Sequence, residues 1–142
     1  MNVENIFSKV EPQKLLHFVY RLNGDLGRTN LIPEDNFLQC SFLSMDKGTT
    51  FKPHKHLYKE RSFDNMVAQE SWVVIRGKVR CIFYDLDDKI LCEKILSPGD
   101  ASFTLHGGHN YEALENETLV YEYKTGPYEG VQLDKVFIGD QQ

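Results

Sequence analysis

The sequence lacks the features that mark membrane-spanning and secreted chains. Its 142 residues contain no apolar run near the ~20 residues that a transmembrane helix needs, and the polar start MNVENIFSKVEPQK is unlike a secretory signal. The three cysteines, Cys40, Cys81 and Cys92, form no CxxC pair and cannot all pair within the chain. Such thiols suit a reducing compartment, so the sequence predicts a cytoplasmic protein without a membrane partner.

Positive charge is outnumbered, with 16 Lys and Arg against 21 Asp and Glu. The formal net charge is −5 and no dense Lys/Arg cluster is present, which argues against a nucleic-acid-binding surface. A chain of this length buries roughly two thirds of its unfolded surface, enough for one core. We therefore predict a single domain over 1–142, with its core at about 37–125 and a C-terminal arm at 126–142.

Helix signals are few. Only the N-terminus has apolar residues at near-helical spacing, which predicts a helical segment within 1–22. The rest is divided into short runs rich in Val, Ile, Phe and Tyr, separated by turn residues such as DKG, LDDK, SPGD and HGG. Many short strands predict an all-β sandwich or barrel. The seven β-prone runs are NFLQCSFLSM, ESWVVIRG, KVRCIFYDL, KILCEKIL, ASFTL, HNYEAL and ETLVYEYK.

Two turns predict how neighbouring strands connect. Gly77 lies between VVI and VRC, and Asp87 and Asp88 lie between FYDL and KIL. Both are typical of hairpin turns, so residues 70–96 are predicted to form an antiparallel meander.

The stretch FKPHKHLY places His54 and His56 one residue apart. On an extended strand both side chains would point to the same side, where they could bind one metal ion or act as an acid and a base. A solvated surface pair is the alternative. Glu70, and either His106 or His109, are the further donors that β-strands could bring to the same cavity. The alternation of side chains along the strand also allows His106, instead of His109, to point inward.

The spacing around these residues resembles the first motif of the cupin superfamily. Five residues separate Gly48 from His54-Lys55-His56, and six separate Glu70 from Gly77, as in that motif, although 13 residues separate His56 from Glu70. The second motif matches at Gly99 and Gly107, whereas Leu105 replaces the usual Pro, His109 comes one residue early and the usual Asn is missing. The stretches QESWVV, LHGGHNYEAL and KTGPYEG are similar to cupins of bacterial polysaccharide and nucleotide-sugar gene clusters.

The resemblance implies a cupin-type jelly-roll barrel that forms a homodimer and holds a divalent metal ion, Zn, Fe, Mn or Ni, on His54, His56, Glu70 and His109. It also implies an isomerase or epimerase acting on a free or nucleotide-linked sugar in surface-polysaccharide synthesis. The alternatives are a metal-free version with His54 or His56 as acid and base, an Fe(II)-dependent dioxygenase, and a non-catalytic sugar-binding module.

Further candidates come from charge and aromatic character near the expected barrel opening. Glu122 and Tyr111 join His54 and His56 as catalytic candidates, although solvated charges and packing aromatics have the same pattern. Cations near the long loop suit an anionic nucleotide-sugar substrate, and aromatic side chains suit its sugar ring. The predicted substrate-binding residues are Lys52, Arg61, Trp72 and Tyr123.

Overall fold

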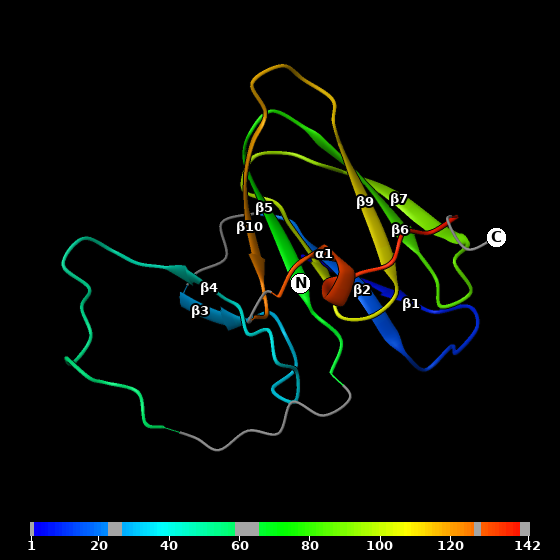
Figure 1. Ribbon diagram of the computed structural model, residues 1–142. Coiled ribbons are helices and arrows are strands. Elements are labelled where there is room, and N and C mark those ends of the chain that lie inside the picture. Colours follow the sequence, from blue (N-terminus) through cyan, green and yellow to red (C-terminus); the bar gives the residue numbers. More distant parts are fainter. Residues whose placement is uncertain (1, 23–26, 59–65, 127–128, 140–142) are drawn as a thin grey trace.

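The computed structural model describes residues 2–22, 27–58, 66–126 and 129–139. Within these ranges the chain is almost entirely β-structure, with antiparallel pairing throughout and one short helix, α1 (Val131–Asp134) (Figure 1). The predicted all-β fold is therefore confirmed. No helix in the described ranges is long and apolar enough to cross a membrane.

Two antiparallel sheets face each other and a small third sheet lies beside them (Figure 1). The largest has the order β1-β2-β8-β5-β10, and the one opposite has the order β7-β6-β9. The five strands of the first are β1 (Val3–Phe7), β2 (Leu15–Tyr20), β8 (Ala101–Thr104), β5 (Glu70–Arg76) and β10 (Leu119–Lys124). The other strands are β7 (Ile90–Leu96), β6 (Val79–Tyr84) and β9 (Gly108–Ala113), with β3 (Gly27–Asn30) and β4 (Ser41–Ser44) forming the third sheet.

The five-stranded sheet is covered on both faces. On its inner face, Val19 and Val74 pack against Cys81 and Phe83 of the three-stranded sheet. On its outer face, Phe18 and Phe103 stack with ring centroids 4.4 Å apart and pack with residues of the segment 31–42. Successive residues of β2 alternate between the two clusters, so this strand is buried on both faces of its sheet.

The predicted N-terminal helix is wrong. Residues 3–7 and 15–20 are strands β1 and β2, paired antiparallel. The run LLHFVY is buried on both faces of its sheet, with Phe18 in one cluster and Val19 in the other. A strand buried on both faces is continuously apolar, and periodicity alone does not distinguish it from a helix.

The predicted meander is only half right. β6 and β7 form a hairpin whose turn contains Asp88 in the left-handed region at φ 63°. β5 and β6, however, belong to different sheets, because β5 pairs with β8 and β10. Gly77, at φ 79°, carries the chain from one sheet to the other, and a Cβ there would lie 2.3 Å from Thr118 Oγ1 in the β9–β10 turn. Thr118 leaves no room for a side chain at this corner.

Candidate functional site

The two sheets are joined at one end by a histidine–carboxylate pair. Glu70 is the first residue of β5 and His109 the second of β9, and His109 Nε2 lies 3.2 Å from Glu70 Oε1. Their side chains are only 13% and 24% exposed. Partial shielding from water strengthens the interaction beyond that of an ordinary surface pair. The pair is the centre of the candidate site.

The surroundings of Glu70 favour its charged form. Burial alone would raise the pKa of Glu70, but the hydrogen bond and charge of His109 oppose this effect, with smaller contributions from the Trp72 N–H and from Lys135. The balance leaves the pKa of Glu70 below its ordinary value. Glu70 is therefore a carboxylate at neutral pH, able to accept a hydrogen bond or orient the imidazole.

Trp72 connects the pair to a second carboxylate. Its single indole N–H lies 3.1 Å from Glu70 Oε1 and 3.1 Å from Glu122 Oε2, so the two acceptors share one donor. Its ring stacks on Tyr111 with centroids 4.0 Å apart and planes 10° from parallel. Glu122 is exposed, since β10 is an edge strand. The site therefore combines an aromatic surface with two carboxylates.

Tyr111 anchors this aromatic surface from inside. Its hydroxyl lies 3.0 Å from Ser102 Oγ on β8, and its ring lies 5.1 Å from that of His109. Burial raises the pKa of Tyr111 well above its ordinary value. The phenol therefore stays protonated at all ordinary pH values, and its hydroxyl is directed at the buried Ser102.

The C-terminal arm lies against the same end of the sheets. Asp134 of α1 forms an ion pair with Lys124 of β10 at 3.2 Å, and Lys135 follows it. Further along, Ile138 packs so closely on Gly108 that a Cβ at Gly108 would lie 2.5 Å from Ile138 Cδ1. The C-terminal arm thus adds one carboxylate and one cation to the surroundings of Glu70, which the sequence did not indicate.

One polar atom of the pair has no partner among the described residues. His109 Nδ1 is buried and makes no hydrogen bond there, whereas Nε2 faces Glu70. If Nε2 donates its proton to Glu70, Nδ1 carries the free lone pair. Buried polar atoms are nearly always satisfied, so an unpaired imidazole nitrogen beside a carboxylate points to a functional group.

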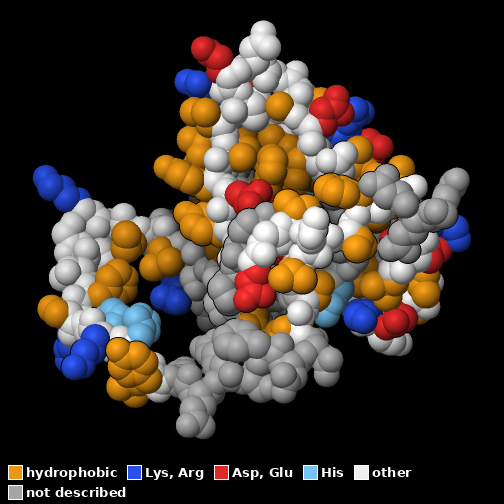
Figure 2. Space-filling model, viewed as in Figure 1, with side chains coloured by type: hydrophobic (Ala, Val, Ile, Leu, Met, Phe, Trp, Pro, Cys, Tyr) orange, Lys and Arg blue, Asp and Glu red, His pale blue; other side chains and the backbone are white. Residues whose placement is uncertain are grey.

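His54 and His56 lie elsewhere. Residues 45–58, which we call the projecting segment, leave the body after β4 without forming a strand, contrary to the expected strand at the histidine pair (Figure 1). Both histidines are exposed, with ring centroids 5.5 Å apart, and His54 Nδ1 lies 2.9 Å from Lys52 O. Figure 2 shows histidine, lysine and hydrophobic side chains gathered on this segment, away from the body.

The metal site implied by the resemblance does not fit the residues as they lie here. Two of its four ligands, Glu70 and His109, are together, but His54 and His56 are on the projecting segment. In the described part of the chain no three His, Cys, Asp or Glu side chains are grouped so as to hold an ion. Divalent metal binding by these four residues stays a prediction.

The remaining predicted residues are divided between several places. Lys52 is exposed on the projecting segment, and Tyr123 is 57% exposed on the outer face of β10, opposite to Glu122. Arg61 lies outside the described residues. His106 follows β8 and is partly buried, which lowers its pKa, while His109 is the histidine that meets Glu70. Among the predicted substrate-binding residues that the structure describes, only Trp72 lies at the pair.

Sequence reasoning missed His17, which lies fully buried on β2. Its Nε2 lies 3.1 Å from Tyr84 O and its Nδ1 3.0 Å from Thr104 Oγ1, and its ring stacks on Phe83. Because a carbonyl only accepts, Nε2 carries the proton and Nδ1 accepts from Thr104. Burial lowers the pKa of His17 to about 4. A lone histidine within an apolar run gave no sequence signal for this role.

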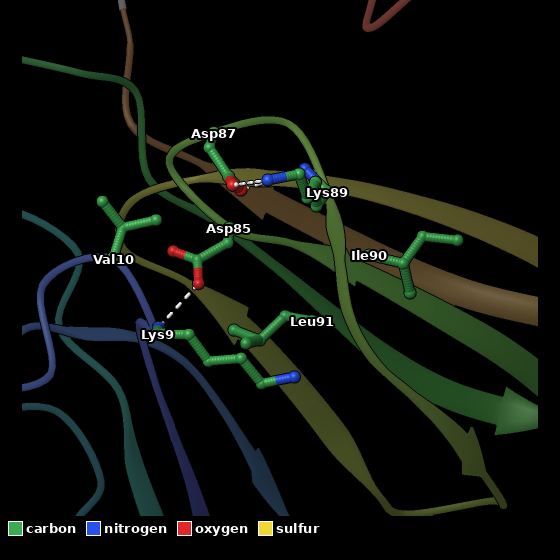
Figure 3. A pocket seen from close by; sticks show the side chains of 7 residues that line it. All are labelled: Lys9, Val10, Asp85, Asp87, Lys89, Ile90 and Leu91. Atoms are coloured by element: carbon green, nitrogen blue, oxygen red, sulfur yellow. Dashed lines mark hydrogen bonds and ion pairs between the residues drawn. The ribbon is translucent and has the colours of Figure 1, made fainter.

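Asp85, also missed, ties two turns together at the same end of the sheets. Its carboxylate accepts from Ser8 Oγ at 2.5 Å and from the Lys9 N–H at 2.6 Å, which joins the β6–β7 turn to the β1–β2 turn. Figure 3 shows Asp85 at the floor of a surface hollow, with the Asp87–Lys89 ion pair above it. The backbone donors make this carboxylate a structural group.

Comparison of the chain with protein-family models, curated proteins and solved structures finds no match.

Proposed function

We propose that the protein is a cupin-type jelly-roll enzyme that isomerises or epimerises a sugar, free or nucleotide-linked, by proton transfer at the Glu70–His109 pair. The observation that carries the proposal is the 3.2 Å contact between His109 Nε2 and Glu70 Oε1, with the buried Nδ1 of the same ring left unpaired. The sequence motif around Glu70 and His109 supports the same pair.

The chemistry needs a base that removes a proton from the carbon next to a carbonyl. In the proposed step the bound substrate displaces the side chains that cover His109 Nδ1, and this nitrogen takes the proton while the C–H electron pair forms an enediolate. The proton then returns to the same carbon from the other face in an epimerisation, or to the neighbouring carbon in an isomerisation, in which the hydroxyl proton passes to the former carbonyl oxygen. Glu70 holds the imidazole in the tautomer that leaves Nδ1 unprotonated, and it stabilises the imidazolium that forms.

Trp72 and Glu122 suit a polyhydroxylated substrate. A flat indole backed by Tyr111 offers a surface for the apolar face of a sugar ring, and the Glu122 carboxylate accepts hydrogen bonds from sugar hydroxyls. The predicted divalent ion would supply charge stabilisation for the enediolate; the two ligands assembled here do not hold it alone.

The test is hydrogen exchange into substrate. The protein is incubated in deuterated buffer with a panel of keto-sugars and nucleotide-diphosphate sugars, with and without added divalent ions, and deuterium incorporation is followed by NMR. A positioned base contributes about 10²–10⁴-fold, so His109→Asn should reduce exchange by at least ~100-fold. His106→Asn is the matched control, because His106 is partly buried nearby but does not contact Glu70, and it should retain most activity.

Two results would overturn the proposal. One is an absence of exchange with every sugar of the panel in the wild-type protein. The other is a His109→Asn variant that exchanges as fast as wild type, which would remove the base from this site.

A further inference from the structure

The projecting segment carries a strand-like pattern without being in a sheet. Over residues 51–57, Phe51, Pro53, Lys55 and Leu57 alternate with Lys52, His54 and His56. Alternation of this kind fits a strand on which Lys52, His54 and His56 share one face, while Phe51, Lys55 and Leu57 share the other.

An open strand edge lies next to the candidate site. β9 is the last strand of the order β7-β6-β9, so within the described residues its outer edge has no neighbouring strand. Exposed edges are rarely left uncovered in proteins because their free N–H and C=O groups pair with any suitable strand. β9 also carries His109, so a strand added at this edge would lie directly beside the Glu70–His109 pair.

The side chains of the projecting segment match this edge in charge and in orientation. On β9, His109 and Tyr111 face inward, and Glu112 faces outward with Arg80. Cross-strand neighbours share a face with Cβ atoms about 5 Å apart, so a strand with His54 and His56 inward lies beside His109. Lys52 then approaches the carboxylates of Glu70 and Glu122, and Lys55 approaches Glu112 on the other face.

Pro53 fixes which edge of the added strand is used. Proline has no N–H, so the backbone of Pro53 must face away from β9, and the backbone groups of Lys55 and Leu57 face the same way. Lys52, His54 and His56 then direct their backbone groups to β9. The pattern therefore describes an edge strand with one side free.

We propose that the projecting segment of one copy adds as a strand to β9 of a second copy, and so brings His54 and His56 to the partner's Glu70–His109 pair. In this structure the segment leaves from the β3–β4 sheet and extends away from its own body (Figure 1). Each copy offers one segment and one open edge, so reciprocal exchange satisfies both in a closed two-fold dimer.

The consequence is a site built from two chains. Glu70, Trp72 and His109 come from one copy, and His54, His56 and Lys52 come from the other, adding the cationic side that an enediolate or a diphosphate needs. This inference deepens the proposed function and rests on the same pair, but its test requires no substrate.

The decisive experiment is a cross-link between the two strands. Cβ atoms of opposed residues lie near the separation of a disulfide, so a cysteine at position 54 or 56 should link to one at position 109. The double variants His54→Cys/His109→Cys and His56→Cys/His109→Cys are made with Cys40→Ser and Cys92→Ser, while Cys81 stays in the core. His109→Cys alone in this background is the control.

Exchange between copies predicts a covalent dimer of twice the 16.5 kDa chain on a non-reducing gel for at least one of the two pairs. A chain linked within itself would show that the segment closes on its own β9, and would overturn the proposal. Folded protein with no specific link in either pair would overturn it as well.

A second pair of variants leaves His109 in place. Lys52→Pro removes a backbone N–H that faces β9, whereas Lys55→Pro removes one that faces away, and both replace a lysine by a proline. Light scattering during size-exclusion chromatography should show loss of the dimer for Lys52→Pro and a retained dimer for Lys55→Pro. A monomeric wild-type protein, or equal behaviour of the two variants, would refute the strand exchange.

Discussion

Acidification should destabilise the protein through His17. This ring is fully buried, with both nitrogens satisfied in its neutral form, and burial lowers its pKa from 6.5 to about 4. Between these two values the unfolded chain binds a proton that the native protein does not. Stability therefore falls as the pH drops from 6.5 towards 4, by at most ~1.4 kcal/mol per pH unit.

Integrated from about pH 7 to about pH 5, this proton contributes a loss of ~2 kcal/mol in the free energy of unfolding. The charged and titratable groups that act on the ring are Asp85, which favours its protonation, and His106 and His109, which oppose it. Urea unfolding followed by Trp72 fluorescence at both pH values measures the change. The informative quantity is the difference between wild type and His17→Gln, because the other groups titrate in both.

His17→Gln keeps a side-chain donor for Tyr84 O but cannot titrate, so its stability should depend less on pH by ~2 kcal/mol over this interval. His106→Gln should remove a smaller part, because His106 is only partly buried. A His17→Gln variant with the full wild-type pH dependence would show that His17 does not cause the effect.

Three further outcomes follow from the packing. Gly107→Ala should destabilise the protein more than Gly27→Ala. Both glycines have φ +78°, so both variants lose the ~1–2 kcal/mol that a left-handed backbone costs, but a Cβ at Gly107 would also lie 2.6 Å from Tyr84 O, whereas one at Gly27 would have no atom within 4 Å. The difference between the two variants in the free energy of unfolding, measured in urea, reports this contact. The Cys81 thiol should not react with a thiol reagent in the native protein, since burial raises its pKa to about 12, and rapid modification without unfolding would contradict this. Asp85→Asn should remove a loss of stability that the wild-type protein shows as the pH falls below 3.8. Desolvation of Asp85 is outweighed by hydrogen bonds that lower its pKa to about 2, and the stability that these bonds give is lost as the carboxylate protonates. Acid unfolding curves of the variant that match those of the wild type would contradict this.

The strands of the core could be predicted because their signals are local. The runs around β5, β6, β7, β8, β9 and β10 combine β-branched and aromatic residues with turn residues at their ends, and each lies within two residues of its expected range. The β6–β7 hairpin followed from Asp87 and Asp88 alone. Pairing partners did not follow, since Gly77 connects adjacent strands that join different sheets.

For the candidate site, motif spacing identified Glu70 and His109, and the tertiary structure brought them together from residues 39 positions apart in the chain, since 109 − 70 = 39. Spacing did not place His54 and His56, because a strand forms only where a neighbouring edge accepts its backbone hydrogen bonds. It also gave no sign of His17, Asp85 or Asp134, whose roles come from partners distant in sequence.

By itself, the sequence determined the β-rich character of the chain, most strand positions and the residue types able to carry proton transfer, because alternation, turn chemistry and side-chain chemistry are properties of short stretches. The tertiary structure was needed to establish that residues 3–7 and 15–20 pair as strands, that β5 and β6 separate into different sheets, and that His109 rather than His106 meets Glu70. Those outcomes depend on which apolar faces bury one another and which strand edges meet, and such long-range choices are made by the whole core.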